Sequence, residues 1–96
     1  MSVYAVYGRG FRRSAWSLRD VFATQEEAER HAAEVVRESE EAVWPTGVPE
    51  EGWGGCIEAA VVESESRTEV PDHLPTDWIA PVVSRFGQRH LAEPYA

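Results

Sequence analysis

The sequence predicts an α+β fold: a small antiparallel sheet, made of a β-hairpin and a third strand, packs on one long capped helix, and the C-terminal segment is irregular or short-helical. Two observations predict it. Runs rich in β-branched and aromatic residues occur near the N-terminus and again after the midpoint. A single stretch between them has apolar residues at helical spacing. The chain is long enough for one domain, so residues 1–96 are expected to form a single α+β unit.

The hairpin is expected at the N-terminus. Residues 3–7 form a β-type run, two glycines then interrupt it, and residues 14–22 read as the second strand. Residues 8–13 between them are expected to be a hairpin loop with an arginine-rich tip. Regular alternation along the second strand would place four side chains on one face: Trp16, Leu18, Asp20 and Phe22. Trp16, inside this strand, is expected to be a core or partly buried residue.

The helix follows directly. Thr24 is a good N-cap, and Glu27 three residues later completes a Thr-x-x-Glu capping box. An apolar stripe of small and β-branched residues then follows helical spacing: Ala28, Ala32, Val35 and Val36. The helix is expected to end at Trp44 because the residue before a proline, here Pro45, avoids the helical region of backbone conformation.

Residues 43–55 are rich in proline and glycine and are expected to be a loop. Residues 56–63 return to a strand pattern and are expected to pair with the hairpin beneath the helix. Alternation there would place Ile57, Ala59 and Val61 on one face and Cys56, Ala60 and Val62 on the other. Residues 64–96 are weakly patterned: a helix over 82–91 is one interpretation and a short strand at 82–86 is the alternative.

The charge of the chain is unevenly distributed. Residues 21–69 hold thirteen carboxylates against three arginines, a balance of −10, whereas residues 1–20 hold four arginines against one aspartate. The net charge of the chain is −8. An acidic block of this kind repels nucleic acid and attracts basic protein surfaces, so direct binding to nucleic acid is not expected.

The sequence also indicates the cellular location of the protein. No apolar run reaches the roughly 18–20 residues that cross a bilayer, and the first residues lack the basic region and apolar core of a signal peptide. Cys56 is the only cysteine, which excludes an intramolecular disulfide. We expect a cytoplasmic protein with no membrane partner.

No catalytic constellation, metal site or cofactor motif is recognised, and the chain is not expected to be an enzyme. Cys56 follows a glycine pair, but a nucleophilic cysteine needs a base and an orienting group. The three histidines, His31, His73 and His90, do not stand at a spacing that supplies one. Cys56 opens an apolar strand and is expected to be a core residue.

The charge pattern favours a non-enzymatic protein-binding module. Its predicted partner-binding residues are the helix and loop acids with two loop tryptophans: Glu26, Glu29, Glu34, Glu38, Glu41, Glu50, Glu51, Trp44 and Trp53. The tryptophans would supply the desolvated anchor that exposed ion pairs lack. If the partner is a nucleic-acid-binding complex, the acids would occupy sites meant for phosphates. Small acidic phage proteins that inhibit host defence, anti-CRISPR proteins among them, are analogous in size, acidity and lack of a catalytic motif.

A second hypothesis is a small homo-oligomeric regulatory or ligand-binding domain. Its site would be the arginine-rich hairpin loop with Arg9, Arg12 and Arg13, which could bind an anion or the acidic block of another copy.

Residues 21–32 resemble the strand-to-helix junction of two families, the peptidoglycan-binding SPOR domain and the HicB-type antitoxin. The SPOR pattern, Phe-x-[Ser/Thr]-x-x-x-Ala-x-x-x-Ala, is matched by residues 22–32, and the HicB pattern, Thr-x-Glu-Glu-Ala-x-x-x-Ala, by residues 24–32. The Val-Gly-Pro-Phe-like half of SPOR domains and the Pro-Asp-x-Pro-Gly-like segment of HicB proteins do not occur in this chain, so no functional residue is carried over from either family.

Overall fold

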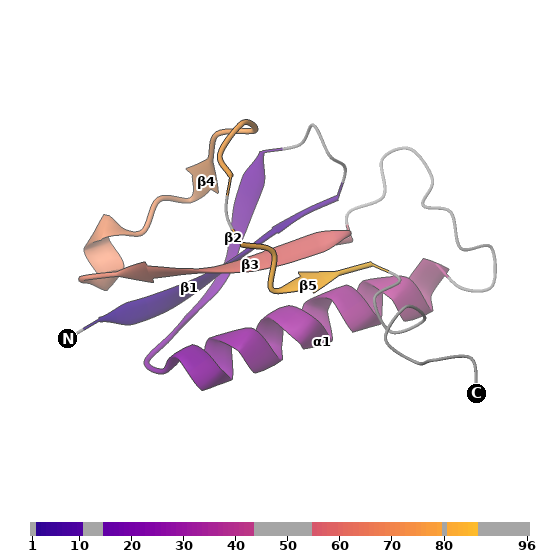
Figure 1. Cartoon of the computed structure of the whole chain (residues 1–96), viewed down its shortest axis with the longest axis horizontal. Coiled ribbons are helices and arrows are strands. Elements are labelled where there is room, and N and C mark those ends of the chain that lie inside the picture. The colour runs from indigo at the N-terminus through magenta and orange to yellow at the C-terminus, as the bar shows by residue number, and fades with distance from the viewer. Residues whose placement is uncertain (1, 11–14, 44–54, 80, 87–96) are drawn as a thin grey trace.

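The computed structural model describes residues 2–10, 15–43, 55–79 and 81–86. They form a five-stranded antiparallel sheet packed against one long helix, which confirms the predicted α+β class. The strands lie in the order β4-β2-β1-β3-β5 (Figure 1). Their bounds are Val3–Arg9 for β1, Trp16–Phe22 for β2, Glu58–Ser64 for β3, His73–Leu74 for β4 and Ser84–Arg85 for β5. The helix α1 spans Gln25–Val43, and a 3-10 turn spans Arg67–Glu69.

Strand β1 is the centre of the sheet. It pairs with β2 on one side and with β3 on the other, both antiparallel, so the predicted hairpin and the predicted third strand are confirmed. β1 continues to Arg9, beyond the end predicted at Tyr7, because the glycine that follows Tyr7 remains paired in the sheet. β4 and β5 add two short edge strands. The sequence pattern did not indicate β4, whereas β5 lies within the short strand given as the alternative for residues 82–86.

A β-bulge in β2 changes which side chains share a face. Val6 pairs with Asp20 and Tyr7 pairs with Leu18, so Arg19 is an extra residue opposite β1. As a result Leu18 lies in the apolar cluster on the face away from the helix, whereas Phe22 packs in the cluster beneath it. The predicted common face of Trp16, Leu18, Asp20 and Phe22 is therefore wrong beyond Leu18. Strict alternation assumes that no residue is inserted in the strand.

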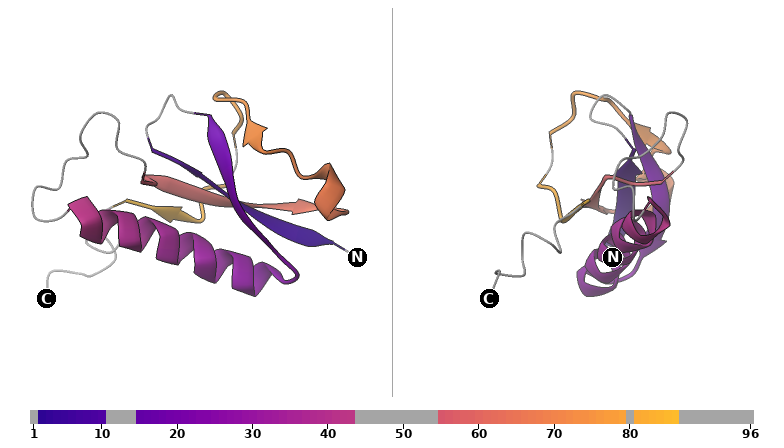
Figure 2. Two further views of the ribbon diagram at one scale, coloured as in Figure 1. Left: turned by 180° about the vertical axis from the view of Figure 1, so that it is seen from behind. Right: turned by 90° about the vertical axis from the view of Figure 1, so that its right-hand side faces the viewer.

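The helix begins as predicted. The backbone N–H of Glu27 donates to Oγ1 of Thr24 at 3.3 Å, which satisfies one of the free N–H groups of the first turn. The buried residues of α1 are Ala28, Ala32, Val36 and Ser39. Three of these four side chains are small, so the helix axis can approach the sheet closely, and α1 runs along the sheet in the second view as well (Figure 2).

The sheet has an apolar cluster on each face. Beneath α1, Val6, Cys56 and Ala59 pack against the buried alanines and Val36 of the helix. On the other face, Tyr7 and Trp16 pack with side chains from the chain that follows β3, among them Leu74 and Trp78. Cys56 therefore shares a face with Ala59, and the prediction that the two lie on opposite faces is wrong. Cys56 precedes the first residue of β3, where strand alternation does not yet apply.

The C-terminal part is extended where it is described. Residues 82–86 contain β5 and no helix, so the helix expected over 82–91 is wrong for these five residues and the short-strand alternative is confirmed. Residues 87–91 lie outside the described residues. No helix in the described ranges combines the length and the apolarity needed to cross a bilayer.

Candidate functional site

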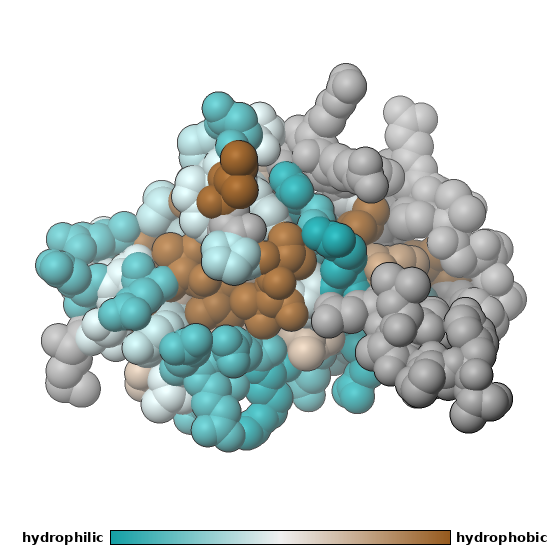
Figure 3. All heavy atoms as spheres, viewed as in Figure 1, coloured by the Kyte–Doolittle hydropathy of each residue, from teal (hydrophilic) through white to brown (hydrophobic). Residues whose placement is uncertain are grey.

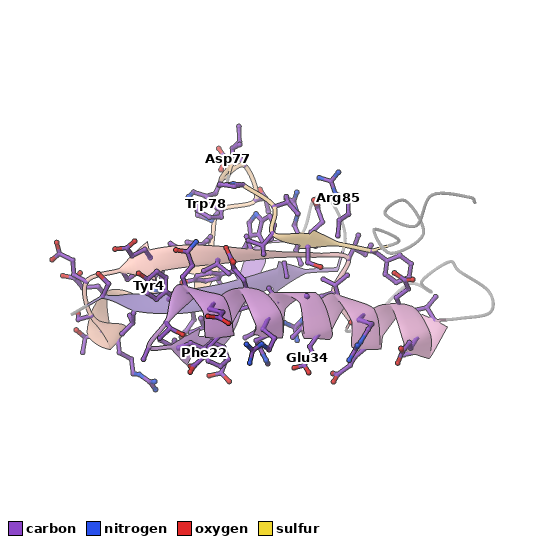
Figure 4. All side chains as sticks on the ribbon, turned by 60° about the horizontal axis from the view of Figure 1, so that its bottom comes forward. Tyr4, Phe22, Glu34, Asp77, Trp78 and Arg85 are labelled. Carbon is purple, nitrogen blue, oxygen red and sulfur yellow. The ribbon has the colours of Figure 1, made fainter. Side chains whose placement is uncertain are left out.

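The predicted helix acids lie on the solvent side of α1. Glu26, Glu29, Glu34, Glu38 and Glu41 are all exposed, and Glu34 points away from the sheet (Figure 4). Residues spaced by three, four or seven positions share one side of an α-helix. That spacing places Glu34, Glu38 and Glu41 in one row with Glu27. These four residues are called the acidic row below.

The two remaining predicted helix acids lie outside the acidic row. Glu26 binds the guanidinium of Arg30 at 3.1 Å, and both side chains are mostly exposed, so this carboxylate is paired within the helix. Glu29 follows Glu27 by two residues, a turn of about 200° around the helix, and so lies on the other flank of the buried stripe. It accepts a hydrogen bond from the Gln25 amide at 3.1 Å. The structure thus divides the five predicted acids into a row and two separate side chains.

Two residues of the acidic row, Glu34 and Glu38, carry charge that the ion pairs of the described residues do not neutralise. Within the described ranges, no ion pair joins Glu34 or Glu38 to a cation. Because like charges at helical spacing repel one another, such a row weakens the isolated helix slightly. Glu34 and Glu38 therefore gain more from a cationic partner than acids already paired with arginines.

A pocket of about 360 Å³ adjoins this row, between α1 and the bulge of β2. It is bordered by Glu38 and His31 of the helix, by Arg19 of the bulge, and by Ser39 and Cys56 at its inner end. The pocket combines one carboxylate, one guanidinium and one imidazole. His31 also packs on Phe22, with 5.0 Å between the ring centroids.

Cys56 is fully buried at the inner end of this pocket, which confirms its prediction as a core residue. Burial raises the pKa of the Cys56 thiol above its ordinary value, and the nearby Arg19 guanidinium only partly opposes this through its charge and a hydrogen bond. The thiol therefore stays protonated near neutral pH. A buried, protonated thiol has neither the access nor the charge of a nucleophilic cysteine.

Ser39 ties the helix to the start of β3. Its hydroxyl donates to the carbonyl of Val35 at 2.9 Å and accepts the backbone N–H of Cys56 at 2.9 Å. This role of Ser39 was not predicted from the sequence. Its position in register with the apolar stripe of α1 is the only signal in the sequence, and a serine there is more often assigned to the solvent face.

Arg9 belongs to the sheet rather than to the hairpin loop. It lies directly opposite Glu58 in the β1–β3 register, and its guanidinium binds the Glu58 carboxylate at 2.8 Å. Arg85 of β5 binds the other oxygen of the same carboxylate at 3.2 Å. The Glu58 side chain is only 8% exposed, so the charge that interrupts the apolar pattern of β3 is buried against two arginines.

The remaining predicted site residues lie outside the described ranges: Arg12, Arg13, Trp44, Glu50, Glu51 and Trp53. Of the other two tryptophans, Trp16 is buried as predicted and Trp78 meets it edge to face, with 6.0 Å between ring centroids. Among the described residues, no three His, Cys, Asp or Glu side chains converge in a way that could hold a metal ion.

The chain was compared with protein-family models, with curated proteins and with known structures, and none of the three comparisons gives a match.

Proposed function

We propose that this chain is a non-enzymatic binding protein that docks the acidic row of α1 on a basic surface of another protein. The observation that carries the proposal is the exposure of Glu34, Glu38 and Glu41 on one side of the helix. Glu34 and Glu38 are not paired with a cation in the described part of the chain. The overall charge of −8 adds a long-range attraction to the same kind of partner.

The length of the acidic row is compatible with docking on a protein surface that otherwise binds nucleic acid. Glu34 and Glu41 are separated by two helical turns, about 10 Å at the usual rise of an α-helix. Three carboxylates over that length present a line of negative charge to arginines and lysines that otherwise contact phosphates. An inhibitor or regulator that mimics nucleic acid is the finer form of the proposal, and it depends on which basic protein is the partner.

Charge alone increases the association rate and the selectivity of such a complex more than it increases the affinity. The affinity needs a buried anchor, and two tryptophans are the predicted anchors. Trp44 follows α1 directly in the sequence, and Trp53 lies nine residues further on. Their role, like that of Glu50 and Glu51, stays a prediction because these residues lie outside the described ranges.

The alternative, an arginine site in the hairpin loop, receives less support. Arg9 is held by Glu58 and lies over the ring of Trp16, so it is already engaged within the fold. The ligand-binding hypothesis stays a prediction for Arg12 and Arg13.

The test compares two triple variants with the same change in charge. The row variant carries Glu34→Arg, Glu38→Arg and Glu41→Arg, which reverse three of the four charges of the acidic row. The control variant carries Glu65→Arg, Glu69→Arg and Asp77→Arg, which reverse three exposed acids outside α1. Glu34 and Asp77 lie on opposite sides of the molecule (Figure 4). Tagged wild-type protein captures partners from a lysate of the source cells, and each captured protein is then purified and its Kd measured for all three forms at two salt concentrations.

The proposal expects the row variant to lose binding by 100-fold or more, about 2.7 kcal/mol. It expects the control variant to lose only the salt-sensitive part of the on-rate. Equal losses in both variants would show that net charge rather than the row determines binding, and an unchanged Kd in the row variant would overturn the proposal.

A further inference from the structure

The outer edge of β3 is only partly covered. β5 pairs with Glu58 and Ala59, and the Ala59 carbonyl also accepts the N–H of Val83 at 3.0 Å. Alternate residues of a strand direct their backbone groups to the same side, so Val61 and Glu63 also direct theirs toward this outer edge. In the described residues no strand pairs with the edge at these two positions. Such an edge can accept an added strand.

A groove of about 180 Å³ runs beside this free edge, on the helix side of the sheet. Tyr4 and Glu63 pair directly across β1 and β3 and contribute to the groove, and Val61 lies next to them. Pro81 and Val83 border the groove on the β5 side. Hydrophobic atoms gather on this face between the β3–β5 edge and α1 (Figure 3).

Two carboxylates from different elements border the groove, Glu29 of α1 and Glu63 of β3. Glu63 accepts the Ser2 hydroxyl at 3.0 Å and Glu29 accepts the Gln25 amide at 3.1 Å. Both donors are neutral, and within the described ranges neither carboxylate binds a cation. The groove therefore combines an apolar surface, an aromatic ring and two uncompensated negative charges.

We propose that this groove receives a lysine or arginine side chain, carried by an extended segment of the partner protein that adds as a strand to the free edge of β3. The aliphatic stem of the basic side chain packs on Val61 and Val83, as long cationic side chains commonly do on apolar surface. Its head group lies between Glu29 and Glu63 and near the ring of Tyr4. The backbone of the segment pairs with Val61 and Glu63.

This inference rests on the proposed function, because it names the part of a basic partner that the acidic chain takes up. A second copy of the chain fits the same edge less well. Two β3 edges paired antiparallel would bring the carboxylates of Glu63 from both copies close together, and like charges facing each other across a sheet are destabilising. Charge complementarity therefore selects a basic segment from another protein.

The probe is a capped hexapeptide that alternates lysine with threonine and valine, so that all its lysines lie on one face when it is extended. Its binding is followed by the amide NMR signals of the intact protein and by fluorescence anisotropy. The inference expects the largest shifts, and new protection from hydrogen exchange, at the amides of Val61 and Glu63. A peptide with norleucine in place of lysine keeps the shape and removes the charge, and it is expected to bind about tenfold more weakly, the combined effect of two partly exposed ion pairs.

Two further changes separate the charge from the backbone pairing. The double variant Glu29→Gln and Glu63→Gln keeps the size of both side chains and is expected to weaken the lysine peptide about tenfold without weakening the norleucine peptide. Two further peptides carry methyl groups on the backbone nitrogens of either the odd-numbered or the even-numbered residues, so each lacks the N–H donors along one of its two edges. The peptide methylated on the edge that faces β3 is expected to lose binding, and the other is expected to keep it.

The acidic-row variant identifies which claim fails. If the row variant loses the peptide and the Glu29→Gln, Glu63→Gln variant does not, the groove inference is wrong and the proposed function stands. If the groove variant alone loses the peptide and the row variant keeps both the peptide and the captured partner, the groove inference stands and the row is not the docking site. No shift at Val61 and Glu63 at millimolar peptide overturns the groove inference.

Discussion

Arg9 lies over the indole ring of Trp16, with its Cζ 4.3 Å from the ring centroid. The same guanidinium binds Glu58, so one side chain links a buried carboxylate to the largest buried aromatic ring of the described core. A buried ion pair is costly to break, because the partner left behind keeps its charge without an opposite charge nearby.

The stability of this cluster is tested by Glu58→Gln. The change leaves Arg9, whose side chain is 16% exposed, without its anion, and we expect it to lower the free energy of unfolding by about 3 kcal/mol. Urea unfolding measures the loss. The control is Arg85→Ala, since that side chain is 59% exposed and its ion pair is expected to contribute less than about 1 kcal/mol. Equal losses in the two variants would refute a special role for the buried pair.

Gly8 is required by the close approach of Cys56. A Cβ atom at position 8 would overlap Sγ of Cys56, so Gly8→Ala is expected to destabilise the fold by about 1–3 kcal/mol through overpacking. The double variant with Cys56→Ala removes the sulfur and is expected to recover part of that loss. A double-mutant cycle in thermal or urea unfolding gives the coupling energy. Strict additivity of the two changes would mean that the contact is not tight.

Ser39→Ala tests the link between α1 and the start of β3. The change leaves the buried N–H of Cys56 without its acceptor, and we expect a loss of about 1–3 kcal/mol in urea unfolding. Ser66→Ala is the matched control, because its hydroxyl hydrogen-bonds that of Thr68 at an exposed position and its loss should stay within about 0.5 kcal/mol. The prediction fails if Ser39→Ala is as mild as its control.

The stability of the protein should fall at alkaline pH. Burial raises the pKa of Cys56 above the reference value of 9.0, and burial together with the charge of Asp72 raises that of Tyr7 above 10.0. Above pH 9.0 the unfolded thiol ionises while the folded thiol stays protonated, so the unfolded state binds fewer protons and the free energy of unfolding decreases as pH rises.

Unfolding measured between pH 7 and pH 11 checks the direction. Cys56→Ala is expected to remove the part of the decline that begins near pH 9.0 and to leave the part from Tyr7, which begins near pH 10.0. Native Cys56 should also react with a thiol reagent only at the rate at which the fold opens. Fast labelling of the folded protein would contradict its burial.

The secondary structure of the first half follows from short-range patterns, and the structure confirms it there. The cap at Thr24 and the alanine stripe of α1 act within a few residues of sequence, so the sequence alone reveals them. The face assignments of β2 fail because the extra residue, Arg19, is defined only by pairing with β1. Nothing in the sequence of β2 itself marks the bulge.

The candidate sites differ in how much of each one the sequence alone predicts. The spacing of Glu34, Glu38 and Glu41 is sufficient to place them on one side of a helix. The pairing of Arg9 with Glu58 and the meeting of Glu29 with Glu63 depend on the β1–β3 register and on how α1 packs on the sheet. These relationships join residues far apart in the chain, which periodicity cannot connect.

The central position of β1 has a consequence for how the protein is made. On the ribosome, the hairpin and α1 are complete once residue 43 has emerged, but the second edge of β1 stays open until β3, which ends at Ser64, has followed. During that interval the nascent chain exposes an unpaired strand edge at the middle of its future sheet, and such edges promote misassembly with other chains. Slow translation between residues 43 and 64 would lengthen this exposure, so codon choice in that stretch is expected to affect the yield of folded protein.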